Sequence, residues 1–501
     1  MPILQLNPLD NVAIAREPIS GGTSVGDITV GTDIPAGHKV AIRSIRQGEA
    51  VLKYGHLIGV ATQTIRTGDH VHTHNLAVPT SVPTANPEAS SLASEPSVEA
   101  PPSSSASFLG YLRPNGRVGT RNYIGILTTV NCSATVAKRI AAHFTPERIA
   151  AYPNISGVVA LTHNTGCGMS SESEGAEVLR RTIAGYANHP NFGAVLLLGL
   201  GCEANQISAL TPLTTTANLT ATTIQQEGGT KAAIARGIAD IEALLPQANA
   251  AQRTPQPLSH LIVGLQCGGS DAWSGITANP ALGLAVDRLI ANGASAILSE
   301  TPEIFGAEHL LTSRSRPEIA QQLIDRIAWW QKYAALHGNA LDNNPSPGNK
   351  AGGLTTILEK SLGAVAKAGS SPLREVIEYA QPITQRGLIF MDSPGYDPVS
   401  ATGQIASGAN LICFTTGRGS VFGAAAVPSL KLSTTTSLYR RMTDDMDINC
   451  GTILDGTETL QQAADRVYDR ILATASGQPT KSEDLGFGEE EFQPWILSAV
   501  L

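Results

Sequence analysis

Residues 77–107 mark the firmest domain boundary in the 501-residue chain. This segment contains six prolines and nine serines but no glycine, lysine or arginine. A segment of this composition cannot bury enough apolar surface to fold alone, so it predicts a semi-extended linker. We therefore expect a small domain over residues 1–76 and a larger body from residue 108 onward.

The first 76 residues predict a small β-rich domain. Short apolar segments alternate there with turn signals, such as Ile34-Pro35-Ala36-Gly37 and Lys53-Tyr54-Gly55. We expect no long helix in this part of the chain.

From residue 108 onward the pattern is that of an α/β protein. Helical spacing of apolar residues predicts a helix near 318–336, and Pro255 and Pro257 mark a boundary between a middle domain, 108–252, and a C-terminal domain, 253–501. Continuous apolar runs of the kind found in parallel sheets predict strands at 123–130, 157–161, 194–200, 260–265, 296–298, 387–391 and 409–414.

Charge and cysteine usage limit the partners and the compartment that we expect. The formal net charge is −8, and no run of lysine and arginine would follow a phosphate backbone, so we expect no nucleic-acid partner. The N-terminus does not resemble a signal peptide, and the longest apolar stretch, 193–201, is far shorter than the roughly 20 residues that span a bilayer. The six cysteines form no CxxC pair. A cytoplasmic protein with reduced thiols and no membrane partner is predicted.

Four predicted strands are each followed within a few residues by a cysteine: Cys132, Cys167, Cys202 and Cys267. If these strands share one sheet edge, the thiols converge where parallel sheets bind ligands. Thiolates are soft ligands that suit iron, zinc or an iron–sulfur cluster. The alternative is that these are small residues packing against helix N-termini.

Polar side chains stand near these cysteines in sequence: His163, Glu203, Asp271 and Asn279. An imidazole such as His163 can act as a general base or as a metal ligand. A hydrogen-bonded structural histidine is the alternative.

Three histidines recur at alternate positions in the segment 68–75. Side chains alternate between the two faces of a strand, so His70, His72 and His74 would share one face. Three imidazoles on one face suit a transition metal or an anionic ligand. The alternative is a polar face in contact with solvent.

Two cations stand in glycine-rich loops. Lys350 lies in NPSPGNKAGG, which lacks the spacing of a nucleotide-binding P-loop and suits a carboxylate better. Arg418 follows the strand predicted at 409–414 and offers bidentate carboxylate binding. A surface turn is the alternative for Arg418.

The longer motifs resemble one family. GRVGTRNYIGILTTVNCSATV, NTGCG, GLGCEANQ, QCGGSDAWSGITANP, SETPEIFGAEHLL, NPSPGNKAGGLTTILEKSLGAVAKAGSS and TTGRGSVFG are similar to segments of the altronate/galactarate dehydratases. AGHKVA, YGHLIG and GDHVHTHN resemble the SAF-type (β-clip) domain with which these enzymes begin. The likeness covers nearly the whole chain and is interrupted by the linker.

The resemblance implies an α/β multidomain fold: an N-terminal β-clip domain, a linker, a middle α/β domain and a C-terminal Rossmann-like parallel-sheet domain. It also implies an iron cofactor (Fe²⁺ or an iron–sulfur cluster, with Mn²⁺ as an alternative), a homodimer and a sugar-acid ligand. The implied activity is that of a hydro-lyase, which converts D-altronate to 2-keto-3-deoxy-D-gluconate. Alternatives are a galactarate dehydratase, a sulfolactate sulfo-lyase-like enzyme or a non-catalytic sugar-acid-binding protein.

On this basis each candidate side chain is given a role. The predicted catalytic residues are His163, Glu203 and Asp271; the predicted substrate-binding residues are His70, His72, His74, Asn279, Lys350 and Arg418; the predicted metal ligands are Cys132, Cys167, Cys202 and Cys267.

Overall fold

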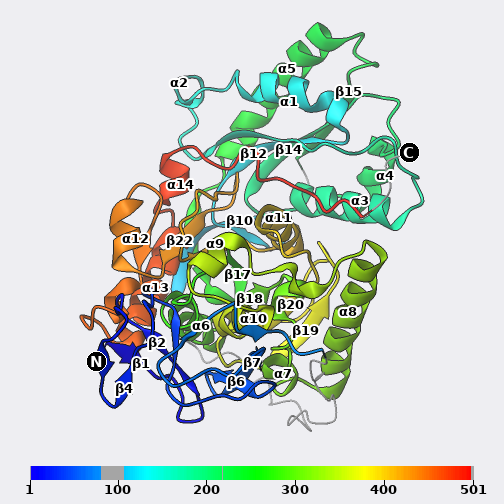
Figure 1. The fold of residues 1–501 in the computed structure, drawn as a ribbon. Helices are drawn as coiled ribbons and strands as arrows, with labels where there is room; N and C mark the ends of the chain where they lie inside the picture. Colours follow the sequence, from blue (N-terminus) through cyan, green and yellow to red (C-terminus); the bar gives the residue numbers. More distant parts are fainter. Residues whose placement is uncertain (1, 81–105, 217, 498–501) are drawn as a thin grey trace.

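The computed structural model describes residues 2–80, 106–216 and 218–497. Figure 1 shows the N-terminal domain beside the C-terminal domain, with the middle domain at the opposite end of the molecule. Most of the linker predicted at 77–107 lies outside the described residues.

The N-terminal domain is built from short antiparallel strands, which confirms the β-rich prediction. β1, β2, β5 and β8 form one sheet, β6, β7 and β9 form a second, and β3 and β4 form a hairpin. The strands are β1 (Ile3–Leu4), β2 (Val12–Ala15), β3 (Ser24–Val25), β4 (Ile28–Thr29), β5 (Lys39–Ala41), β6 (Ala50–Lys53), β7 (His56–Ala61), β8 (His70–Val71) and β9 (Leu76–Ala77).

A three-stranded antiparallel sheet joins the segment after the linker to the segment after the middle domain. β10 (Ser107–Leu112) lies between β11 (Val118–Gly119) and β16 (Arg253–Pro257). Pro255 and Pro257 are tolerated in β16 because it is an edge strand, where a missing N–H leaves no ladder bond unmade. The middle domain is therefore an insertion between two strands of one sheet.

The middle domain contains a four-stranded parallel sheet in the order β13-β12-β14-β15. Every residue of β14 is buried, as its apolar run predicts. Helices α1 and α5 pack together against the sheet, while α3 contacts α11 of the C-terminal domain. The elements are β12 (Tyr123–Thr128), α1 (Ala134–Ala141), α2 (Pro146–Ile149), β13 (Gly157–Leu161), α3 (Glu174–Ala187), β14 (Phe192–Gly199), α4 (Ile207–Leu210), β15 (Leu219–Thr223) and α5 (Thr230–Asn249).

The C-terminal domain is built on a seven-stranded parallel sheet in the order β19-β20-β18-β17-β21-β22-β23. The four strands predicted here are confirmed as β17, β18, β20 and β21, and the predicted helix is confirmed as α8. The strands are β17 (Ile262–Cys267), β18 (Ser295–Leu298), β19 (Leu373–Ile377), β20 (Leu388–Met391), β21 (Leu411–Thr416), β22 (Ser429–Ser433) and β23 (Ile448–Asn449). The helices are α6 (Ala278–Ala291), α7 (His309–Thr312), α8 (Pro317–Leu336), α9 (Pro347–Ala351), α10 (Ile357–Val365), α11 (Asp397–Ser407), α12 (Thr436–Arg441), α13 (Leu460–Ala475) and α14 (Lys481–Asp484).

The N-terminal and C-terminal domains share one hydrophobic core. Ile58 and Ile65 of the first domain belong to the same buried cluster as Leu362 and Val365 around α10. The hydroxyl of Thr356, at the start of α10, donates a hydrogen bond to the carbonyl oxygen of Ile58. No helix among the described residues has the length and apolar character that crossing a bilayer requires.

Candidate functional site

Three of the predicted thiols lie on neighbouring loops at one edge of the middle-domain sheet. Cys132, Cys167 and Cys202 follow β12, β13 and β14, and all three are exposed. Hydrogen bonds join these loops: the Asn131 N–H donates to the Thr165 carbonyl (3.0 Å), and the Asn205 N–H donates to that of Gly166 (3.0 Å). The parallel strands therefore bring these loops together, as predicted.

The fourth thiol lies elsewhere, so the expectation that all four share one sheet edge is wrong. Cys267 ends β17, which belongs to the seven-stranded sheet, and it is buried. Along the chain, β15, α5 and β16 separate β14 from β17, and β17 belongs to the second sheet.

His163 and Glu203 are held by hydrogen bonds to the backbone and to Thr129. Nε2 of His163 lies 3.0 Å from the carbonyl oxygen of Thr128, and Nδ1 accepts from the Thr165 N–H at 3.3 Å. The two Glu203 carboxylate oxygens accept from the Thr129 hydroxyl and the Gly201 N–H, each at 2.6 Å. The structure gives no support to their predicted catalytic roles.

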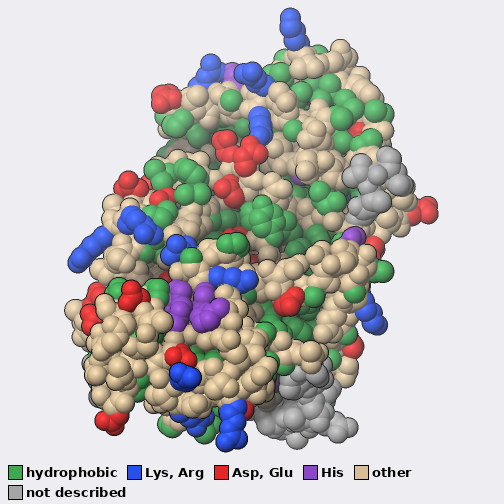
Figure 2. Space-filling view, in the orientation of Figure 1, with side chains coloured by type: hydrophobic (Ala, Val, Ile, Leu, Met, Phe, Trp, Pro, Cys, Tyr) green, Lys and Arg blue, Asp and Glu red, His purple; other side chains and the backbone are tan. Residues whose placement is uncertain are grey.

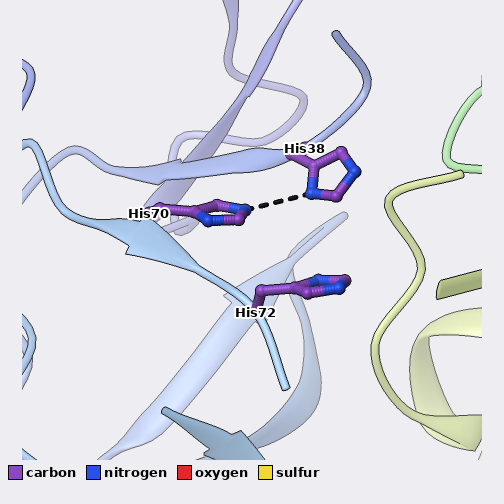
Figure 3. Close-up of side chains that lie close together, drawn as sticks. All are labelled: His38, His70 and His72. Carbon is purple, nitrogen blue, oxygen red and sulfur yellow. Dashed lines mark hydrogen bonds between the residues drawn. The ribbon is translucent and has the colours of Figure 1, made fainter. Parts of the chain in front are cut away.

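The histidines of the N-terminal domain form the most compact imidazole cluster among the described residues (Figure 3). Nδ1 of His38 lies 3.0 Å from Nε2 of His70, and the His70 and His72 rings stack at a centroid distance of 5.4 Å. One nitrogen from each of the three rings lies within 4.8 Å of the others. His74 is next to this cluster, with its ring centroid 5.6 Å from that of His70.

Sequence reasoning missed His38. It directly precedes β5, which pairs antiparallel with β8 so that Val40 faces His70 across the ladder. The sequence contains the AGHKVA motif, but it does not show that two short strands about 30 residues apart pair with each other. The structure thus replaces the predicted set of His70, His72 and His74 by a core of His38, His70 and His72.

Burial keeps the three imidazoles neutral. It lowers the pKa of His38, and it lowers that of His70 to about 4 and that of His72 to about 3, with like charges nearby adding to the effect. Nδ1 of His72 is buried and makes no hydrogen bond. Neutral imidazoles with an unused nitrogen are the form that binds transition metals, so this donor set fits a divalent ion.

The cluster faces a loop of the C-terminal domain. Nε2 of His38 lies 3.4 Å from the carbonyl oxygen of Ala351, the last residue of α9. Lys350, the neighbouring residue, is partly buried. Figure 2 shows the imidazoles as one surface patch where the two domains meet. The predicted substrate-binding histidines and Lys350 therefore belong to one region.

Asp271 packs against the loop that follows α9, since a Cβ on Gly352 would lie 2.9 Å from the Cβ of Asp271. Its carboxylate accepts hydrogen bonds from the Ser274 side chain and N–H and from the Thr434 hydroxyl, and burial raises its pKa to about 6. A Cβ on Gly417 would lie 2.1 Å from the carboxyl carbon, so only glycine fits there. Asp271 is thus held in place with a pKa suited to proton transfer near neutral pH.

The remaining predicted substrate ligands differ in exposure. Arg418 is exposed, and its N–H donates to the Gly269 carbonyl at 2.8 Å, which places it beside the loop that leads to Asp271. Asn279 is buried and borders, with Asp271, a void of about 10 Å³. This space admits about one water molecule. The role of Asn279 in substrate binding stays a prediction.

A second group able to hold a metal surrounds Cys267. Ligand atoms of Cys267, Glu300 and Glu303 lie within 4.8 Å of one another, and all three residues are buried. Burial raises the pKa of the Cys267 thiol to about 11. The two glutamates come soon after the end of β18 and were not predicted, although they stand in the sequence at the position where the other strands deliver their cysteines.

Three family models together match nearly the whole chain. Residues 1–79 match the altronate/galactarate dehydratase SAF domain. Residues 110–249 match the second domain of D-galactarate dehydratase/altronate hydrolase, and residues 258–500 match the C-terminal domain of D-galactarate/altronate dehydratase.

Curated relatives agree with these matches. The chain is 34% identical to an altronate dehydratase of Bacillus subtilis, with 97% of each chain covered. It is 38% identical to a galactarate dehydratase (L-threo-forming) of Escherichia coli, over 96% of this chain and 94% of the relative. It is also 32% identical to the β subunit of a (2R)-sulfolactate sulfo-lyase of Chromohalobacter salexigens, over 76% of this chain and 96% of that subunit.

Proposed function

The chain belongs to the altronate/galactarate dehydratase family, and from this premise we propose that it is a hydro-lyase that removes water from a sugar acid. The observation that carries the proposal is near-full-length similarity to dehydratases together with a neutral three-histidine cluster at a domain interface. D-altronate, giving 2-keto-3-deoxy-D-gluconate, is the proposed substrate, and galactarate is the alternative.

His38, His70 and His72 would hold the divalent metal, with Fe²⁺ as the first choice and Mn²⁺ as the alternative. The unused Nδ1 of His72 supports this assignment, because a buried nitrogen without a partner is costly unless a ligand satisfies it. When bound, such an ion supplies Lewis acidity toward the oxygens of a carboxylate whose α-proton is being removed.

The protein's own residues bind the substrate and transfer protons. Lys350 and Arg418 offer the charge-assisted hydrogen bonds that a sugar-acid carboxylate needs. Asp271 replaces His163 and Glu203 as the proposed proton acceptor at the α-carbon, since its raised pKa places the ionised form in reach of neutral pH.

An anaerobic assay with ferrous iron across a panel of aldonates and aldarates tests the proposal. We expect a 2-keto-3-deoxy acid from one class and loss of turnover with a strong iron chelator, restored by ferrous iron. Full turnover in metal-free protein, or release of sulfite from sulfolactate instead, would overturn it. Tight binding without turnover would indicate a sugar-acid-binding protein.

The three exposed thiols are the second candidate for iron, in this case as an iron–sulfur cluster. Their loops are joined by hydrogen bonds, and the buried Oδ1 of Asn205 beside them has no partner. Visible absorption of anaerobically purified protein tests this: a cluster gives a broad charge-transfer band that a Cys132→Ser/Cys167→Ser/Cys202→Ser variant loses. A colourless, iron-loaded and active protein would rule the cluster out.

We also propose that the C-terminal domain is a Rossmann-like variant and that the protein works as a cytoplasmic homodimer. The parallel seven-stranded sheet flanked by helices supports the first point. Light scattering coupled to gel filtration tests the second, with twice the chain mass of 52.2 kDa as the expected result.

A further inference from the structure

A closed cluster of ionisable groups lies at the carboxyl ends of the central strands β17 and β18. Cys267 ends β17, while Glu300 and Glu303 follow β18, and the three are 2%, 1% and 3% exposed. The carboxyl end of a parallel sheet is where such folds bind ligands. None of these groups takes part in the proposed dehydration.

The two carboxylates of this cluster differ in their hydrogen-bond partners. Oε1 of Glu303 accepts from the Lys360 ammonium (2.6 Å) and the Asn344 amide (2.8 Å), and Oε2 accepts only a long hydrogen bond from the Cys267 thiol (3.8 Å). Both carboxylate oxygens of Glu300 are buried without any hydrogen-bond partner. A buried carboxylate in that state is strongly destabilising unless a cation or a proton satisfies it.

The backbone is strained to present Glu300 in this way. Its φ of 72° and ψ of 68° lie in the left-handed region, which costs a non-glycine residue of order 1–3 kcal/mol. Such strain persists where surrounding structure holds a side chain at a required place.

The charges around the cluster leave room for one divalent cation. The Lys367 ammonium lies 2.9 Å from the Cys267 sulfur and 4.0 Å from a Glu300 oxygen, and Lys360 pairs with Glu303. The facing acids are the two glutamates, the thiol and Asp397. When all four are ionised, they exceed the two lysines by two charges.

We propose that Cys267, Glu300 and Glu303 form a second, structural metal site for a divalent transition ion such as zinc or ferrous iron. A thiolate with two carboxylates suits such ions better than magnesium or calcium. The three residues are buried, so an ion here would lack the substrate-accessible position that a catalytic metal keeps. The ion would neutralise the cluster and fix the ends of β17 and β18 together.

Cobalt substitution tests this site separately from the other two candidates. The test protein carries His70→Ala, His72→Ala and serine at the three exposed cysteines, and it is produced in cobalt-supplemented medium so that the ion enters during folding. We expect about one cobalt per chain by mass spectrometry and a thiolate-to-cobalt charge-transfer band in the near ultraviolet. The wild-type chain is measured in the same way.

Substitutions in the cluster and a matched control decide the outcome. Cys267→Ser should abolish the band, and Glu300→Gln, which keeps the shape of the side chain, should lower cobalt content at least tenfold. Cys413→Ser, at a buried thiol in the adjacent strand β21, should change neither. Absence of the band in both starting proteins, or an equal cobalt content in soluble Glu300→Gln protein, would overturn the proposal.

Discussion

Lys39 of the N-terminal domain lies 2.8 Å from Glu359 of the C-terminal domain, and both side chains are fully buried. Lys53 contacts the other oxygen of the same carboxylate at 2.8 Å. Burial alone would raise the pKa of Glu359, but the two ammonium groups hold it well below its usual range. One carboxylate therefore pairs with two lysines at the interface that positions the histidine cluster.

Glu359→Gln should destabilise the protein strongly. The substitution leaves two buried ammonium groups with no counter-charge, and breaking a buried ion pair on one side costs about 3–5 kcal/mol. The free energy of unfolding from urea denaturation measures the change. Glu318→Gln is the control, because its pair with Arg316 is solvent-exposed and contributes less than about 1 kcal/mol. Equal losses in the two variants would contradict the interface described above.

The protein should lose stability as the pH falls from about 6.5 to 4, in part through His163. Burial lowers the pKa of His163 to about 4, whereas an unfolded histidine titrates near 6.5. The unfolded state therefore binds the proton first, and about 3 kcal/mol of stability present above pH 6.5 is lost by pH 4.

Urea unfolding at pH 7 and pH 5 checks the role of His163. The His163→Gln variant should be less stable at pH 7 but should lose less on acidification than the parent. His143→Gln, at a partly exposed histidine, should leave the acid-induced loss unchanged. If His163→Gln has the parent's full pH dependence, the buried imidazole is not its source.

Seven strands of the α/β part were predictable because burial leaves a direct apolar signal in the sequence, whereas others, such as β10, β15, β19 and β22, were not predicted. The runs that became β12, β14 and β17 read as uninterrupted apolar segments. Which strands share a sheet was not predictable, because pairing depends on contacts between distant segments. The sequence therefore groups Cys267 with the other three thiols, although its strand, β17, belongs to the seven-stranded sheet and theirs belong to the four-stranded sheet.

The candidate site was half visible from the sequence. Alternation within 68–75 predicts a strand with His70 and His72 on one face. The two rings do stack, but β8 ends at Val71, so a turn after the strand brings His72 beside His70. His38 could not be assigned to the cluster from the sequence, because the pairing of β5 with β8 brings it there. The sequence shows which residues are ionisable but not which of them are hydrogen-bonded. The Glu203 carboxylate accepts hydrogen bonds, whereas the oxygens of Glu300 have no hydrogen-bond partner.

Lys350→Met should weaken substrate binding more than it slows the chemical step. A hydrogen bond to a charged group contributes about 1.5–3 kcal/mol, so KM should rise about tenfold to a hundredfold while kcat changes little. Steady-state kinetics with the identified sugar acid measure this. Lys332→Met, on the exposed face of α8, is the control and should leave KM unchanged. A fall in kcat with constant KM would place Lys350 in the chemistry rather than in binding.

Asp271→Asn should lower kcat by about 10²–10⁴, the range for loss of a general base. Because burial raises the pKa of Asp271 to about 6, the rate of the parent should fall as the pH drops below that value, where the carboxylate is protonated. The Ser274 hydroxyl donates to this carboxylate at 3.1 Å and holds its pKa down. Ser274→Ala should therefore move the inflection of the pH–rate profile to higher pH while retaining most of the maximal rate. A carboxylate that only holds its loop in place would give a different pattern: Asp271→Asn would lower the melting temperature, and the inflection would stay where it is in Ser274→Ala.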